Sequence, residues 1–97
     1  MKKGTFVIVR GRDCGVHAGE FVSRKGREVV LANSRRIWYW SGAASLSELA
    51  VYGAKNPTVC KFGVPISGNI ELLDTCEVIP CAEAGERMIR TCHEWRA

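Results

Sequence analysis

The chain has 97 residues, of which 46% are hydrophobic and 25% charged, a composition typical of one soluble globular domain. The formal net charge of +4 argues against an acidic mimic of DNA, and the apolar run at residues 6–9 is too short for a signal peptide or a membrane span. We therefore expect a single domain over residues 1–97 that acts in the cytoplasm and has no membrane partner.

The first forty residues have the pattern of antiparallel strands joined by short turns. Gly26 suits the positive φ of a tight hairpin, and the pair Asn33-Ser34 indicates a turn or bulge. His17 lies on the same predicted strand face as Phe21. The four predicted strands are residues 5–10, 15–24, 28–32 and 36–40.

A short helix is predicted to follow the fourth strand. Ser45 and Glu48 have the spacing of a capping box, in which each side chain accepts a hydrogen bond from a free backbone N–H group at the helix start. Apolar residues then recur at helical intervals, and Gly53 suits the left-handed position just past the last turn. The pattern predicts a helix over residues 46–52.

The second half of the chain adds a long strand over residues 70–79 and a short extended piece at residues 59–62. From Ala82 onward, despite Gly85, an apolar stripe predicts an amphipathic helix; it consists of Met88, Ile89, Cys92 and Trp95. We expect an α+β fold, with a bent antiparallel sheet or a small open β-barrel of about five strands and two short helices. A core of this size is small, so we also expect a homo-oligomer.

The chemically distinctive groups gather in one short segment. Paired arginines bind phosphate or carboxylate through two-point contacts, and Trp38 and Trp40 share one strand face that could stack on a base. The small-residue turn that follows would let an anion approach the helix start. The predicted binding residues for a small anionic, nucleotide-like ligand are Arg35, Arg36, Trp38, Trp40, Ser41, Gly42 and Ser45.

Other interpretations of this segment remain open at the level of sequence. Aromatic residues in strands commonly fill the core, and paired arginines are commonly solvated. An aromatic and arginine-rich surface around Trp38, Tyr39, Tyr52 and Trp95 would equally suit a module that binds a host protein. Basic residues at the turns allow a third, weaker hypothesis, a nucleic-acid binder.

No catalytic or metal-binding pattern accompanies the segment. The five cysteines lack the short paired spacing of zinc sites, and without an export signal we expect them to be reduced. Cys92 and His93 are sequence neighbours that would point apart on a helix, so they do not suggest a nucleophilic pair. We therefore predict a protein that is not an enzyme and that needs neither a metal nor a cofactor.

The run Arg35-Arg36-Ile37-Trp38-Tyr39-Trp40, followed by residues 42–47 and by Pro57 and Cys60-Lys61-Phe62, resembles a family of small proteins encoded by tailed bacteriophages and prophages. The resemblance extends from Val7 to Trp95. It implies an accessory phage protein acting in the host cytoplasm, where small anti-defence proteins bind signalling nucleotides or host proteins. It assigns no binding or catalytic residue.

Overall fold

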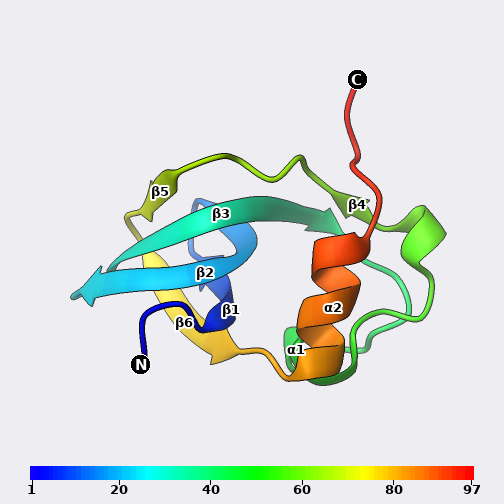
Figure 1. Cartoon of the computed structure of the whole chain (residues 1–97), viewed down its shortest axis with the longest axis horizontal. Coiled ribbons are helices and arrows are strands. Elements are labelled where there is room, and N and C mark those ends of the chain that lie inside the picture. The colour runs from blue at the N-terminus through cyan, green and yellow to red at the C-terminus, as the bar shows by residue number, and fades with distance from the viewer.

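The computed structural model describes residues 1–97 and contains six strands, two α-helices and one short 3-10 helix (Figure 1). Three long strands come first and form a meander. They are β1 (Phe6–Gly11), β2 (Gly15–Lys25) and β3 (Glu28–Tyr39). The later elements are α1 (Leu46–Tyr52), η1 (Pro57–Val59), β4 (Lys61–Phe62), β5 (Asn69–Leu72), β6 (Thr75–Pro80) and α2 (Glu83–Thr91).

All six strands belong to one antiparallel sheet, in the order β4-β3-β2-β1-β6. β5 lies on the same edge of β3 as β4, because it pairs with residues 29–32 of β3 whereas β4 pairs with residues 37–39. The sheet remains open. This confirms the predicted α+β fold, and the open bent sheet is the form that is observed.

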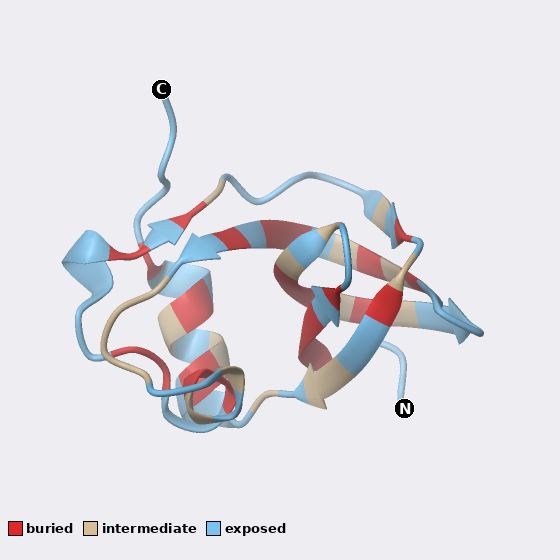
Figure 2. Ribbon diagram, turned by 180° about the vertical axis from the view of Figure 1, so that it is seen from behind, coloured by how far each residue is buried: buried red, intermediate tan, exposed pale blue.

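The sheet has a hydrophobic core on each face. Phe6 and Ile8 of β1 pack on the side covered by the helices, whereas Val7 and Val9 pack on the opposite side with Leu31. Because β1 lies inside the sheet and both of its faces are covered, its sequence is continuously apolar. Figure 2 shows buried residues along the central parts of the strands and on the side of α2 that faces them.

The two helices begin and pack for identifiable reasons. The Ser45 hydroxyl accepts a hydrogen bond from the Glu48 amide at 3.1 Å, as the capping box predicts, and the Glu48 carboxylate accepts one from the Ala44 amide at 2.9 Å. Gly85 of α2 lies against α1, and a Cβ there would be 2.0 Å from the carbonyl oxygen of Ala50. A glycine is therefore required where the two helices touch. Neither helix is long and apolar enough to cross a bilayer.

Three predictions of element boundaries are wrong. Strands predicted at residues 28–32 and 36–40 are one strand, β3, because Asn33 accommodates a bulge with a φ of 50° instead of ending the strand. The strand predicted at residues 70–79 is two strands, β5 and β6, which are separated at Leu73-Asp74. Trp95 lies beyond the end of α2, so it is not part of the helix's apolar stripe.

Candidate functional site

The bulge in β3 decides which of its side chains face which core. Ala18 pairs with Arg35 and Glu20 pairs with Ala32, so Asn33 and Ser34 lie together opposite Gly19. A Cβ on Gly19 would be 2.8 Å from the Cα of Ser34, so only glycine leaves room for the bulge. The extra residue reverses the alternation of β3, as expected where two residues oppose one.

As a result, Arg35 and Arg36, which the sequence predicts to bind one anion together, point to opposite faces of the sheet. Arg35 lies on the helix-covered face, where Ile37 is also buried. Arg36 lies with Ser34 and Trp38 on the other face of the sheet. The structure therefore separates two guanidinium groups that the sequence places side by side.

Arg35 is 4% exposed, and its guanidinium donates five hydrogen bonds to backbone carbonyls. These five bonds use every N–H group of the side chain. Two of the acceptors belong to the last turn of α2 and its C-terminal boundary, where a cation is favourable. The acceptors are the carbonyl oxygens of Phe62, Gly63, Ile89, Cys92 and His93, at 2.8 to 3.1 Å. Arg35, predicted as a ligand contact, thus has no free donor and acts as a structural tie.

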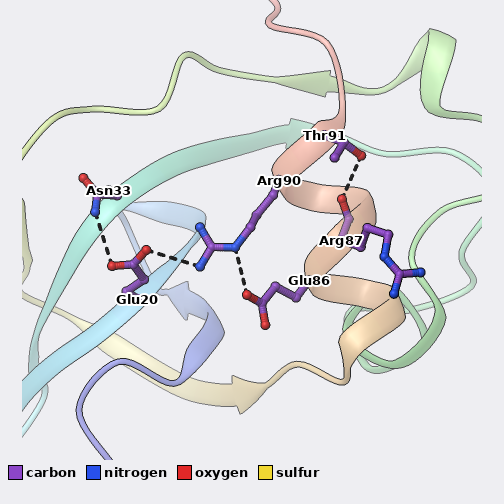
Figure 3. A network of polar contacts seen from close by, with 6 residues as sticks. All are labelled: Glu20, Asn33, Glu86, Arg87, Arg90 and Thr91. Atoms are coloured by element: carbon purple, nitrogen blue, oxygen red, sulfur yellow. Dashed lines mark hydrogen bonds and ion pairs between the residues drawn. The ribbon is translucent and has the colours of Figure 1, made fainter.

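A second group of polar contacts holds α2 to the sheet beside the bulge (Figure 3). Arg90 donates hydrogen bonds to the carboxylates of Glu86 at 2.8 Å and of Glu20 in β2 at 3.2 Å. The Glu20 carboxylate also accepts a hydrogen bond from the side-chain amide of Asn33 at 3.2 Å. The Arg90 guanidinium also lies 4.5 Å from the ring centre of Phe6. The residue that forms the bulge is therefore linked to the helix that Arg35 ties.

The edge of β3 between β4 and β5 is covered by an irregular segment, residues 63–68, which Figure 1 shows running along the strand. Its backbone binds β3 at three points, including Ile66 N–H to Ser34 carbonyl and Gly63 N–H to Arg36 carbonyl, both at 2.8 Å. Pro65 has no N–H group, so the segment cannot form a regular ladder. The side chains of Val64 and Ile66 instead form one wall of a cavity.

This cavity has a volume of about 320 Å³ and lies on the face of Arg36 and Trp38. Half of its ten lining residues are hydrophobic, and its size is at the lower end of the range of roughly 300–1,000 Å³ for small-molecule sites. The lining residues are His17, Ser34, Arg36, Trp38, Gly63, Val64, Ile66, Ile70, Trp95 and Arg96. We call it the His17 cavity.

The exposed residues that line the His17 cavity form its mouth, and they include two indole rings. Trp38 of β3 and Trp95 of the C-terminal tail are stacked, with ring centres 6.1 Å apart and planes inclined by 10°. Trp38 is 63% exposed and Trp95 44% exposed, so neither is sealed in the core. The tail is held in place by a hydrogen bond of 2.8 Å from the backbone N–H of Trp95 to the Phe62 carbonyl. Flat apolar surface is thus available to a ring that enters the cavity.

The charged groups near the mouth are mainly cationic. Arg36 donates one hydrogen bond, to the Cys14 carbonyl at 2.9 Å, which leaves other N–H groups of its fork free. Arg96 also lines the cavity and forms an exposed ion pair of 3.8 Å with Glu94. The Lys61 ammonium lies 5.5 Å from the ring centre of Trp95. These positive charges would attract an anion to this side of the protein.

His17, on β2, is the buried polar residue of the cavity. It is 2% exposed and pairs with Val9 on one side and Arg36 on the other, and neither ring nitrogen has a hydrogen-bond partner. Burial, with a smaller contribution from the Arg36 charge, lowers the pKa of His17 to about 4. The ring is therefore neutral at physiological pH, with one unused donor and one unused acceptor. The alternation of β2 correctly predicts the face of His17, but not the cavity above it.

The remaining predicted site residues lie elsewhere or are occupied by the protein itself. Trp40 packs partly against the helix-side core and donates to the Ala43 carbonyl at 3.3 Å. With Arg36 and Trp38 it lines a different hollow, of about 290 Å³, next to residues 13–16. Trp40 therefore does not share the His17 cavity.

The turn before α1 is also closed by its own contacts. The Ser41 hydroxyl accepts a hydrogen bond from the side-chain amide of Asn56 at 3.1 Å. Gly42 is required for two reasons: its φ is 95°, and a Cβ would be 2.5 Å from the Lys55 backbone nitrogen. The Ser45 hydroxyl caps the helix. The side chains of Ser41 and Ser45 are thus paired within the protein, and the Glu48 carboxylate lies at the helix start, where the sequence predicts an anion.

One other hollow is unsuited to an anion, and no cluster of metal ligands is present. A shallow hollow of about 440 Å³ is lined by three carboxylates, Asp13, Glu71 and Asp74, which would repel an anion. No three His, Cys, Asp or Glu side chains converge as metal ligands, and the five cysteines are free thiols. Burial, helped by Asp74, raises the pKa of Cys14 to about 11, so this thiol is protonated at physiological pH.

Comparison with known proteins gives one match, to a family model described as a domain of unknown function (DUF6948), over residues 4–89. No curated protein and no solved structure was found to match the chain. The matched residues include His17, Arg36, Trp38 and the segment 63–68, whereas Trp95 and Arg96 lie outside them. Because the match covers most of its length, the chain belongs to the DUF6948 family.

Proposed function

We propose that the protein binds a small, nucleotide-like anion in the His17 cavity. One observation carries the proposal: an arginine with free donors, two stacked indoles and an unpartnered buried imidazole line the same cavity of about 320 Å³. A nucleotide needs a cation for its phosphate, a flat apolar ring to stack on its base, and a neutral hydrogen-bonding group for the polar edge of that base.

The magnitudes favour a small ligand. Stacking of a base on an aromatic side chain contributes about 1–3 kcal/mol, and a charge-assisted hydrogen bond to arginine about 1.5–3 kcal/mol before the entropic cost of binding is subtracted. Because the cavity is near the lower limit for ligand sites, it suits one ring system with one anionic group. A larger nucleotide would leave part of itself in solvent.

We further propose that the protein captures this ligand without converting it. Neither a carboxylate nor a thiol lines the His17 cavity, so a general base or nucleophile would have to come from His17 itself. In a bacteriophage setting, capture of this kind would remove a host defence signal from the host cytoplasm. Stacking surfaces supplied by a second subunit of a homo-oligomer would increase the affinity.

The test is isothermal titration calorimetry of the purified chain with AMP, GMP, cyclic AMP, cyclic GMP and ADP-ribose. Arg36→Ala and Trp38→Ala should each weaken binding by about tenfold or more, since each removes one of the contacts above, and should remain folded with only a modest decrease in melting temperature. Arg27→Ala, in the exposed hairpin at the far end of β3, is the matched control for charge and should bind normally. If none of these nucleotides gives a binding heat or raises the melting temperature, the proposal is wrong.

A second candidate, a module that binds a host protein, is favoured by the exposed rings of Trp38, Tyr39 and Trp95, the last two of which flank the Lys61 ammonium. Aromatic side chains at a partly polar surface are typical of protein interfaces. Tyr39 does not line the His17 cavity. Under this candidate, Tyr39→Ala abolishes capture of a host protein from lysate at high salt, whereas under the first it leaves nucleotide binding unchanged.

A third candidate, weak binding of nucleic acid, is distinguished by length and salt. Binding of a single-stranded oligothymidylate would exceed that of thymidine monophosphate and would weaken steeply with added salt, because each contacted phosphate releases a counterion. Equal affinity for the two ligands would instead support capture of the free nucleotide.

A further inference from the structure

The imidazole of His17 has unsatisfied hydrogen-bonding groups that the fold itself does not explain. It is almost completely buried, and neither Nδ1 nor Nε2 has a protein partner. Leaving a buried polar group unpaired is costly because its hydrogen bonds to water are lost on folding, and such groups are rare in folded proteins. An apolar side chain would fill this strand position more favourably, so the histidine indicates a partner from outside the chain.

The surroundings restrict where that partner can lie. On either side in the sheet His17 is paired with Val9 and Arg36, and the strands β1 and β3 cover it there. His17 lines the cavity together with the neighbouring buried Ser34, and because both ring nitrogens are covered, a ligand in the cavity reaches one of them after a small shift of the lining side chains. A partner must therefore enter through the mouth beside Trp38 and Trp95.

We propose that His17 recognises the polar edge of a nucleobase, so that the base of the ligand lies on the cavity floor and its anionic group lies at the mouth beside Arg36. This inference rests on the proposed function and adds an orientation and a specificity-determining residue to it. A purine or pyrimidine edge offers both donors and acceptors, so it can pair with a neutral imidazole nitrogen whether that nitrogen donates or accepts; because the two ring nitrogens point apart, one base edge engages one of them.

The opposite orientation, with the anion on the floor, is disfavoured by the charge state of the ring. An anion would be bound best by a protonated imidazole, but burial and the Arg36 charge both oppose protonation of His17. The spacing of β3 supports the chosen orientation. In the sheet His17 is paired with Arg36, and Trp38 follows Arg36 by two residues, which is roughly 7 Å along the strand. A base that contacts Trp38 can therefore reach toward His17.

The experiment compares GMP and AMP with ribose 5-phosphate, which carries the same anion without a base, by calorimetry on three proteins. The wild type should bind a nucleotide at least about tenfold more tightly than ribose 5-phosphate. His17→Leu, which is apolar and of similar volume, should reduce that difference severalfold, to the part that stacking on the indoles provides, while its affinity for ribose 5-phosphate stays the same. His17→Gln, which retains a donor and an acceptor, should restore part of it.

Other outcomes would either contradict recognition of the base by His17 or identify the source of the base. If GMP, AMP and ribose 5-phosphate bind equally, or if His17→Leu leaves the preference for a nucleotide unchanged, His17 does not recognise the base, although capture of an anion stands. If nothing binds, both this inference and the proposed function are wrong. An oligothymidylate that binds more tightly than thymidine monophosphate would identify the source of the base as a nucleic-acid strand rather than a free nucleotide.

A spectroscopic measurement on the unmodified protein avoids any dependence on how the variants fold. The imidazole nitrogen resonances of His17 should shift when GMP or AMP is added, and they should not shift with ribose 5-phosphate. Resonances that respond equally to all three compounds, or to none, contradict recognition of the base by His17.

Discussion

Arg35 and Arg36 are adjacent in β3, yet the first is enclosed by five backbone carbonyls and the second lines the His17 cavity. One guanidinium ties α2 and the C-terminal tail to β4, and the other has free donors near a solvent-accessible mouth. The tie also positions the site, because the tail that Arg35 holds carries Trp95 to Trp38.

Replacing Arg35 should therefore damage stability, whereas replacing Arg36 should not. Arg35→Leu leaves several buried carbonyls unpaired, and we expect the free energy of unfolding to fall by about 3 kcal/mol or more. Arg36→Ala removes one hydrogen bond at an exposed side chain and should cost less than about 1 kcal/mol. Urea denaturation of both variants, monitored by tryptophan fluorescence, measures the difference.

Arg35→Lys provides a sharper comparison within the same experiment. Its three N–H donors cannot reach five carbonyls arranged around a planar fork, so its stability should lie between those of the wild type and Arg35→Leu. Equal stabilities for Arg35→Leu and Arg36→Ala would show that the five contacts do not stabilise the fold.

Features that depend on neighbouring residues could be predicted from the sequence. The cap formed by Ser45 and Glu48 and the limits of α1 are confirmed, because both are fixed by contacts within a few residues. The irregularity at Asn33 is also confirmed, since asparagine tolerates the positive φ found there. The strand-face position of His17 is also correct, since β2 alternates normally there.

Features that depend on distant contacts could not be predicted. The carbonyls that surround Arg35 lie 27 to 58 residues away in the chain, so nothing nearby indicates that its charge is buried. The sequence predicts a turn or bulge at Asn33-Ser34. It does not show that the strand continues through the bulge, and this continuation decides to which faces of the sheet Arg35 and Arg36 point. Trp95 joins the site because α2 ends at Thr91, which an apolar stripe alone cannot indicate.

Gly85→Ala should destabilise the protein, although alanine normally favours a helix. A Cβ at this position would lie 2.0 Å from the Ala50 carbonyl oxygen and 2.8 Å from that of Leu49, so the backbones of α1 and α2 would have to separate. We expect a loss of about 2–3 kcal/mol, against a gain of about 1 kcal/mol at an unhindered helix position. Thermal denaturation measures the change. Ala84→Gly, at the exposed neighbouring position, is the control for helix propensity; a Gly85→Ala protein more stable than the wild type would contradict the close helix contact.

The stacking of Trp38 on Trp95 should appear as a coupling energy. Both rings are partly exposed, so each single alanine variant loses modest packing, but the pair makes a contact that neither ring makes alone. A double-mutant cycle of Trp38→Ala and Trp95→Ala, followed by urea denaturation, should give a coupling of about 0.5–1.5 kcal/mol. Strict additivity would mean that the tail does not rest on β3 in solution.

The pH dependence of stability should contain a contribution from His17. Its pKa of about 4 in the folded protein lies below the ordinary value near 6.5 that applies after unfolding. Between these two values the unfolded chain binds a proton that the folded protein does not, so the free energy of unfolding decreases as the pH is lowered through this window. For a fully buried ring the loss is up to about 3 kcal/mol, and it is absent above the upper value.

His17→Leu isolates this contribution, because it removes the titrating ring and retains the carboxylates that also titrate at low pH. Unfolding by urea should show the wild type losing more stability than His17→Leu between neutral pH and the region of pH 4.5. At neutral pH the variant should be at least as stable as the wild type, since an apolar side chain leaves no buried donor or acceptor unpaired. Parallel pH curves for the two proteins would show that the imidazole of His17 is in contact with water. The conclusion that His17 is buried and neutral in the cavity would then be wrong.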